Sequence, residues 1–251
     1  MTEKELFEIV SRAWRSLKGG EIKIAPGVEA YEFWPGSYLP YIDWRYLKEP
    51  STDLVSKIIE YSKNREIKAY FNMLESRRDE GTELAESLGM KFEHSMSFAI
   101  NTKNFIGDDL PEYEYDIAPL DSHLFEEYSK LTMDIFGFSD DKITKGNRDF
   151  FKKYPNENRV LIMRSNGEAI GTGCFCVNDG VGWFFGGAVY PKFQGNKFGK
   201  AILFELMNES AKLGATVWFS QTQHEKVMKM ADYTVGLDTY SFPDGIETSW
   251  E

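Results

Sequence analysis

The sequence predicts an α/β protein of the α+β type, with two modules and a mixed, mainly antiparallel sheet flanked by helices. Three observations lead to this prediction. Segments with strand periodicity and segments with helical periodicity are interleaved along the chain. A hairpin turn joins consecutive strands near residue 166. A glycine-bearing, charged stretch at residues 101–114 separates two parts with a similar order of elements.

Residues 1–108 are predicted to form the first module. Apolar residues recur at helical spacing from Leu54 to Tyr61, which indicates a helix over residues 51–65. A second helix is predicted over residues 76–88, where Gly89 would serve as its C-cap. The predicted strands of this module cover residues 22–34, 38–46, 67–71 and 92–100.

Residues 109–251 are predicted to form the second module. Its first helix is expected over residues 122–136 with Ser122 as N-cap, and a second helix over 140–154. Residues 165–168, Ser-Asn-Gly-Glu, predict a tight hairpin turn. Further helices are expected over 198–213 and 225–230, and strands over 113–117, 160–164, 169–177, 181–190, 216–220 and 237–242.

The two modules end alike. Residues 84–98 (LAESLGMKFEHSMSF) resemble residues 228–242 (MKMADYTVGLDTYSF) at an offset of about 144 residues. Both segments read as a helix, a turn and a strand that closes on Ser-Phe. Either chance or an internal repeat explains this similarity, and the matching order of the preceding elements favours the repeat.

Composition narrows the possible functions. The net charge of −11 argues against nucleic acid as the main partner, because phosphate-backbone binding needs a basic face. No apolar run approaches the ~20 residues needed to cross a bilayer, so no membrane partner is expected. The N-terminal residues have no signal-peptide pattern, and Cys174 and Cys176 are read as reduced thiols, so a cytoplasmic location is predicted. The three histidines show no metal-ligand spacing, and no metal is expected.

One segment carries the chemistry. Residues 186–203 read GGAVYPKFQGNKFGKAIL, in which a strand runs into a short glycine-bearing loop and then directly into an amphipathic helix. Such a loop leaves backbone N–H groups free at the positive end of the helix dipole, which suits a pyrophosphate. Gly195 and Gly199 would let the backbone approach this ligand, and Lys197 and Lys200 would add positive charge. Neither the P-loop pattern nor the dinucleotide fingerprint is present.

This segment resembles the acetyl-CoA motif of the GNAT N-acetyltransferase superfamily, [QR]-x-x-G-x-[GA] after a strand that ends in a V-x-P-like sequence. Gln194 matches the first position of the motif and Gly199 the last, whereas Lys197 stands where the middle glycine is expected. The resemblance covers residues 113 to 251 and includes the order of elements. It implies an acyltransferase that moves the acetyl group of acetyl-CoA to a primary amine of a small molecule or peptide.

The resemblance also implies which residues bind the cofactor. Backbone groups of the strand would pair with the pantetheine arm, amides of the loop would hold the pyrophosphate, and Gln221 would lie where the family often has an Asn. A solvated loop position is the alternative for Gln221. The expected cofactor-binding residues are Gly187, Ala188, Val189, Gln194, Gly195, Asn196, Lys197, Phe198, Gly199, Lys200 and Gln221.

The usual catalytic groups of the family are missing from their expected places. Met228 stands where a tyrosine often protonates the thiolate, and methionine cannot donate a proton. Thr216 corresponds to the strand position that sometimes holds a glutamate base. Other candidate acids or bases are Tyr190, His224, Glu225 and Tyr240, for each of which a structural or surface role is the favoured interpretation. The catalytic residues and the oligomeric state are not predicted.

The first module has no counterpart of the loop, since residues 46–52 (YLKEPST) contain no glycine. It is therefore interpreted as a degenerate copy without a cofactor site, as in a tandem GNAT protein. Aromatic residues gather between Trp14 and Tyr46 and again at residues 183–185, either as packing groups or as walls of an amine pocket. The alternative function is a non-catalytic CoA-binding or partner-binding protein of the same fold.

Overall fold

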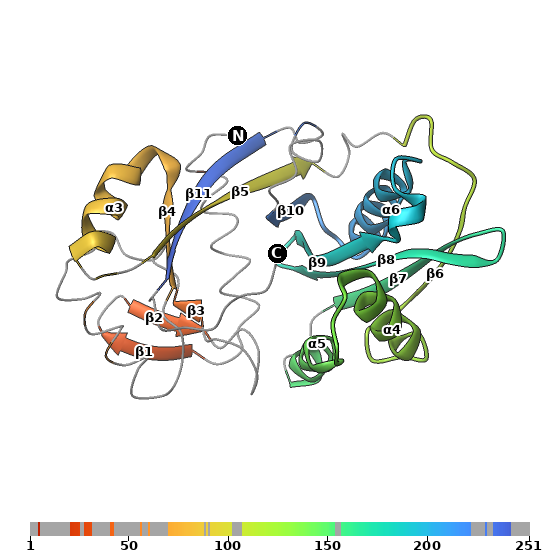
Figure 1. The fold of residues 1–251 in the computed structure, drawn as a ribbon, viewed down its shortest axis with the longest axis horizontal. Helices are drawn as coiled ribbons and strands as arrows, with labels where there is room; N and C mark the ends of the chain where they lie inside the picture. Colours follow the sequence, from red (N-terminus) through yellow and green to blue (C-terminus); the bar gives the residue numbers. More distant parts are fainter. Residues whose placement is uncertain are drawn as a thin grey trace. The chain divides into compact units, whose positions relative to one another are not determined.

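The computed structural model describes residues 5, 21–25, 28–31, 41–42, 56, 60, 70–87, 89, 91–101, 107–153, 157–221, 229 and 233–241. The chain divides into two compact units (Figure 1). Unit 1 comprises residues 1–97, 221–225 and 234–251, and unit 2 comprises residues 98–220 and 226–233. The fold is α+β, with a mixed, mainly antiparallel sheet and flanking helices.

Unit 1 contains two groups of strands. The first is a three-stranded antiparallel sheet of β1 (Glu21–Ala25), β2 (Val28–Tyr31) and β3 (Tyr41–Ile42). The second runs in the order β4 (Tyr70–Leu74), β11 (Tyr233–Ser241) and β5 (Lys91–Asn101). Between β4 and β5 in sequence lies a 3-10 turn, η2 (Glu75–Arg77), followed by helix α3 (Arg78–Ser87).

Strand β11 lies between two strands that precede it by more than a hundred residues in sequence. It pairs antiparallel with β4, with Leu237 opposite Leu74 and Tyr240 opposite Phe71, and β5 is its other neighbour. Figure 1 shows the blue β11 close to the orange β4 and the yellow β5. The two segments that resemble each other in sequence thus end in strands, β5 and β11, that are neighbours in one sheet.

The strands of unit 2 lie in the order β10-β9-β8-β7-β6. Antiparallel pairs join β6 (Glu114–Ala118), β7 (Glu157–Ser165), β8 (Glu168–Asn178) and β9 (Val181–Val189). Strand β10 (Val217–Gln221) is parallel to β9, because α6 crosses over between them. The predicted hairpin turn is present: Asn166 and Gly167 have φ of 51° and 78°, so both central residues take the left-handed conformation that a two-residue hairpin favours.

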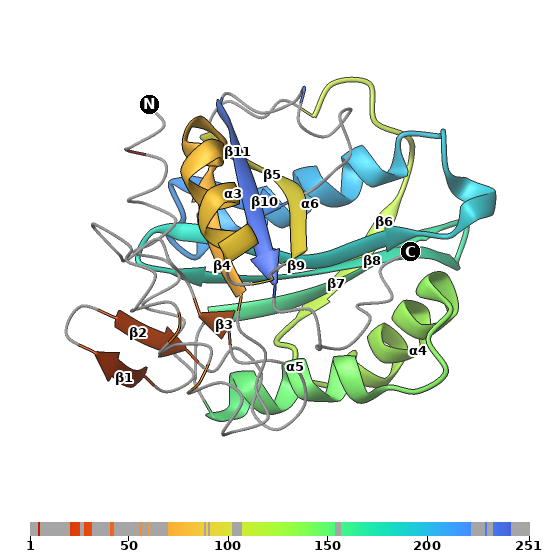
Figure 2. The same ribbon diagram turned by 60° about the vertical axis from the view of Figure 1, so that its left-hand side comes forward.

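Helices cover both faces of this sheet (Figures 1 and 2). On one face lies α6 (Phe198–Lys212), which buries Ile202, Leu206 and their neighbours against β7 and β8. On the other face α4 (Phe125–Phe136) packs against β7, β8 and β9 through Phe125, Tyr128 and Leu131. Helix α5 (Lys142–Lys153) lies beside α4, and the hydroxyl oxygens of Ser129 and Thr144 are 2.6 Å apart between them. This core positions the segment with the predicted loop.

Two sequence predictions need correction. In place of the one strand predicted over residues 22–34, the described residues form two shorter strands, β1 and β2, with Ala25 paired with Val28; the Pro26-Gly27 pair in the sequence is a turn signal. Helix α4 begins at Phe125 after Leu124, without a side-chain cap, and the Ser122 hydroxyl accepts a hydrogen bond from the Leu124 N–H at 3.3 Å instead.

Gly89 has the expected positive φ of 66°. The helix predicted over 51–65 lies largely outside the described residues, as does the one over 225–230.

Both cysteines are free and buried on β8. Burial raises the pKa of Cys174 to about 12 and also raises the pKa of Cys176, so neither thiol ionises near neutral pH. Among the residues that the structure describes, no helix has the length and apolar character to cross a membrane. The same residues contain no group of three or more His, Cys, Asp or Glu side chains arranged to hold a metal ion.

Candidate functional site: a bulged strand that runs into a helix start

Strand β9 has one paired edge and one partly open edge. On one side it pairs with β8 over its whole length, with a register shift between Cys174 and Phe175 that leaves residue 185 as an extra residue in β9. On the other side its pairing with β10 covers only three pairs and ends at Trp183 and Phe219. Within the described residues, the edge of β9 after this bulge therefore has no strand partner on the side of β10.

The backbone of this open edge presents hydrogen-bonding groups at alternate residues. The Tyr190 N–H donates to the Ile170 carbonyl at 3.0 Å, and Ala188 lies opposite Thr172. Hydrogen-bonded and non-hydrogen-bonded pairs alternate in an antiparallel ladder. Ala188 consequently exchanges its hydrogen bonds with β8, whereas the N–H and C=O groups of Gly187 and Val189 point away from β8. The Val189 carbonyl accepts a hydrogen bond from the Gln194 side chain at 3.1 Å, so an added extended chain can pair with both backbone groups of Gly187 and with the N–H of Val189.

The loop after β9 turns the chain sharply into α6. A 3-10 turn, η3 (Pro191–Phe193), follows Tyr190, and the residues of the turn at 194–197 are exposed. Gly195 has a φ of 84° and Lys197, the N-cap of α6, has a φ of 64°. Helix α6 starts at Phe198, as the sequence predicts. No described residue accepts a hydrogen bond from the backbone N–H groups of residues 195–200, which gather at the positive end of the helix dipole.

Three side chains of the loop hold its shape. The Gln194 side-chain amide donates to the Val189 carbonyl at 3.1 Å, and the Asn196 side-chain amide donates to the Phe193 carbonyl at 3.4 Å. The Phe198 ring is buried and packs edge-on against the ring of Phe193, with centroids 6.1 Å apart. Of these three residues, Phe198 is buried, whereas Gln194 and Asn196 are exposed.

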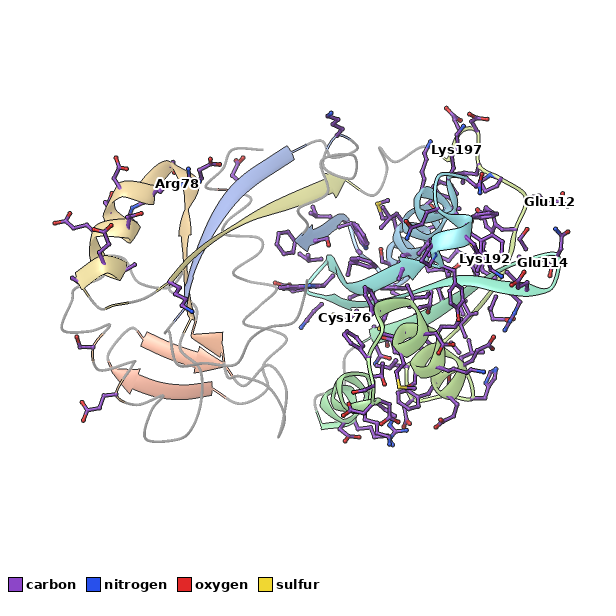
Figure 3. All side chains as sticks on the ribbon, in the orientation of Figure 1. Arg78, Glu112, Glu114, Cys176, Lys192 and Lys197 are labelled. Carbon is purple, nitrogen blue, oxygen red and sulfur yellow. The ribbon has the colours of Figure 1, made fainter. Side chains whose placement is uncertain are left out.

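The two lysines of the motif have partners from another segment. The Lys197 ammonium forms an ion pair with the carboxylate of Asp109, and the Lys200 ammonium donates to the backbone carbonyl of Asp108 at 2.9 Å. Figure 3 shows Lys197 beside the segment that leads into β6. The lysines were expected to face phosphates, and the structure adds Asp108 and Asp109 to their surroundings. Sequence reasoning missed these residues, because only the fold brings them close to a loop about 90 residues later.

Packing requires a glycine at position 187 but not at position 199. A Cβ at Gly187 would lie 2.6 Å from the Phe184 ring and 3.2 Å from the Thr172 carbonyl oxygen, so packing demands glycine there. A Cβ at Gly199 would meet only Val189 Cγ2, at 4.0 Å. Packing therefore does not require a glycine at 199, which is exposed in the first turn of α6.

The candidate acid and base groups are spread over the molecule. The Tyr190 hydroxyl donates to Asp134 of α4 at 3.1 Å, and burial, this hydrogen bond and the nearby negative charge raise the pKa of Tyr190. The backbone N–H and the hydroxyl of Thr216 donate to the Gly180 carbonyl at 2.8 and 3.4 Å. Gly180 directly precedes β9, whereas the loop follows the other end of this strand, so a residue at 216 is too far away to act at the loop. Met228, His224 and Glu225 lie outside the described residues, as does the side chain of Tyr240 in β11.

Gln221 is the last residue of β10, and its side chain lies outside the described part of the structure. In β10, residues 217–219 pair with β9. Gln221 lies two residues beyond the last of them, Phe219.

Comparison with known proteins identifies relatives of this fold. Residues 122–232 match the sequence model of the Acetyltransferase (GNAT) family. No curated protein matches the chain significantly. Among solved structures, a GCN5-related N-acetyltransferase from Kribbella flavida aligns with a TM-score of 0.73 and 11% identity, covering 95% of this chain and 96% of that one.

Two further solved structures are similar. A GCN5-related N-acetyltransferase from Sphaerobacter thermophilus aligns with a TM-score of 0.61 and 16% identity over 96% of this chain and 87% of that one. A tandem GNAT protein from the clavulanic acid biosynthesis pathway aligns with a TM-score of 0.61 and 10% identity over 88% of this chain and 79% of that one. At such low identities these similarities concern the fold. The sequence match to the GNAT family model covers residues 122–232, the segment that contains the bulged strand and the loop.

Proposed function

We propose that the protein is an N-acetyltransferase that transfers the acetyl group of acetyl-CoA to a primary amine of a small molecule or peptide. The observation that supports this proposal is that two backbone features follow one another directly within residues 122–232. The open edge of β9 after the bulge leads directly to the free N–H groups at the start of α6. An extended arm along the strand and a pyrophosphate at the helix start fit these two features in turn.

In this proposal the backbone does most of the binding. Gly187 and Val189 would hydrogen-bond the amide groups of the pantetheine arm as an added strand does. The amides of residues 195–200 would hold the pyrophosphate, since they are free of acceptors among the described residues and lie at a helix N-terminus. The proposed cofactor-binding residues are Gly187, Ala188, Val189, Gln194, Gly195, Asn196, Lys197, Phe198, Gly199, Lys200 and Gln221.

The reaction places modest demands on the protein. The neutral amine nitrogen attacks the thioester carbonyl, a C–N bond forms, the C–S bond breaks, the nitrogen that became positively charged on attack loses a proton and the thiolate gains one. An N–H on the open edge of β9, such as that of Val189, would polarise the carbonyl, and positioning alone contributes much of the acceleration. General acid–base help is typically worth ~10²–10⁴-fold, so its absence slows the reaction without abolishing it.

The division into modules is part of the proposal. Residues 1–108 would be a degenerate GNAT-like module without a cofactor site, and residues 109–251 the acetyltransferase domain. The similarity in fold, over most of the chain, to the tandem GNAT protein from the clavulanic acid biosynthesis pathway supports this arrangement. The end of the second half departs from this boundary in the structure, because residues 234–251 belong to unit 1 and β11 lies between β4 and β5.

Two measurements on the full chain test the function. Titration calorimetry with acetyl-CoA measures binding, and detection of the released thiol over a panel of primary amines measures transfer. Binding together with transfer to at least one amine supports the proposal. Binding without transfer to any amine would favour a non-catalytic CoA-binding protein, and lack of binding would refute both.

A further inference from the structure

Lys197 occupies a backbone conformation that glycine adopts at lower cost. Its φ is 64° and its ψ is 5°, in the left-handed region. A residue with a Cβ costs roughly 1–2 kcal/mol more than glycine there. The resemblance to the GNAT motif also expects glycine at this position. A non-glycine residue in such a conformation at a candidate site suggests that its side chain has a task.

The side chain of Lys197 is held by the segment before β6. Its ammonium pairs with Asp109, while the Lys200 ammonium donates to the Asp108 carbonyl at 2.9 Å. Gly107 lies flat against Phe204 of α6, because a Cβ there would be 2.6 Å from the ring. Three consecutive residues thus run along the first two turns of α6. We call residues 107–109, together with Lys197 and Lys200, the latch.

The latch places the Asp109 carboxylate beside Lys197, close to where the proposed cofactor would bring its phosphate groups. The hydrogen bond from Lys197 and its charge lower the pKa of Asp109, so this carboxylate is ionised at neutral pH. Lys197 is also the N-cap of the helix whose first N–H groups are free of acceptors in the described structure. A phosphate bound to those N–H groups would attract the same ammonium that Asp109 holds.

We propose that Asp109 competes with the phosphate groups of acetyl-CoA for Lys197, so that Asp109 lowers cofactor affinity and cofactor binding opens the latch. This inference rests on the proposed function, since it assumes a phosphate at the start of α6. Lys197 and Asp109 are 51% and 85% exposed, so the competition is a modest one. An exposed ion pair of this kind changes an equilibrium constant by about two- to fivefold.

A pair of neighbouring substitutions tests the competition. Asp109→Asn removes the ion pair and keeps a residue type that tolerates the left-handed conformation, since Asp109 has a φ of 61°. Asp108→Asn is the matched control: it makes the same charge change one residue away, at a position that contributes its backbone carbonyl to the latch. Titration calorimetry with acetyl-CoA on the full chain, at low and high salt, gives the dissociation constants.

Asp109→Asn is expected to bind acetyl-CoA about two- to fivefold more tightly than the wild type at low salt, with a smaller gain at high salt. Asp108→Asn should change the dissociation constant by less than about 1.5-fold, because its charge is screened and it has no share in the ion pair. In a Lys197→Gly background, Asp109→Asn should have no effect beyond that of Asp108→Asn.

Equal effects of the two asparagine substitutions would overturn the latch, because they would show a general charge effect. So would an Asp109→Asn effect that persists without Lys197. A wild-type protein that does not bind acetyl-CoA would refute the proposed function itself, and the latch with it. The failure of the latch alone is thus recognised by normal binding of acetyl-CoA to the wild type.

Discussion

Replacement of Gly199 by glutamate tests the assignment of the loop, because it should strengthen the fold and weaken binding at the same time. A Cβ at 199 meets only Val189 Cγ2, at 4.0 Å, so the larger side chain has room. Glycine in a helix costs ~1 kcal/mol relative to a good helix former. An acidic residue in the first turn also interacts favourably with the helix dipole. The Gly199→Glu protein should therefore melt at the wild-type temperature or a few degrees above it.

The expected loss of affinity follows from the position of the new charge. Two unit negative charges about 7 Å apart repel each other by about 0.6 kcal/mol in water and by about 2.4 kcal/mol at an effective dielectric constant near 20. The middle of this range, about 1.5 kcal/mol, corresponds to a dissociation constant that is roughly 10-fold larger. Titration calorimetry with acetyl-CoA measures it.

Two controls separate charge from size and from general charge effects. Gly199→Gln has almost the same shape without the charge, so it should lose less affinity than Gly199→Glu. Ala211→Glu adds the same charge at an exposed position near the other end of α6 and should leave affinity unchanged. A folded Gly199→Glu protein with wild-type affinity would show that this loop does not bind the phosphates.

Three further predictions concern packing, the last described strand and the chemistry. Gly187→Ala should destabilise the protein by about 1–3 kcal/mol in urea denaturation, since its Cβ would clash, whereas Gly186→Ala, whose Cβ meets no described atom within 4 Å, should change stability little. A chain that stops before Tyr233 should lose protection of α3 amides in hydrogen exchange, because β11 separates β4 from β5; wild-type protection would contradict this. If no residue acts as general base, the transfer rate should rise up to about tenfold per pH unit below the amine pKa of ~10, and Met228→Tyr should raise turnover. A rate limb near pH 6 to 7 would reveal an unidentified acid or base.

Local sequence patterns correctly predicted those features of the fold and the site that depend on only a few neighbouring residues. The hairpin at Asn166-Gly167 and the start of α6 at Phe198 were predicted correctly, because turn residues and helical spacing act over a few positions. The GNAT resemblance of the second half was also confirmed for residues 122–232. The bulge at residue 185 was missed, although consecutive glycines at 186 and 187 inside a strand are a recognised signal for one.

Features that depend on distant residues could not be predicted in this way. The periodicity of residues 237–242 indicates a strand, but not that this strand pairs with β4 and β5. The contact of Lys197 with Asp109 depends on how the segment before β6 crosses α6, which no local pattern encodes. The proposed roles of the cofactor-binding residues, Gln221 included, stay predictions until binding is measured.

The position of β11 has a consequence for how the newly made protein folds. A ribosome completes β4 and β5 long before it adds the residues that lie between them, so the pairing of Leu74 with Leu237 must wait for most of synthesis. Until then two strand edges of the first unit are without their neighbour, and such edges readily pair with other chains. The β6–β9 meander and α6 are made earlier than β11 and contain mostly local contacts, which form faster. We therefore expect the nascent chain to be exposed to edge-to-edge association in the interval between the synthesis of β5 and that of β11.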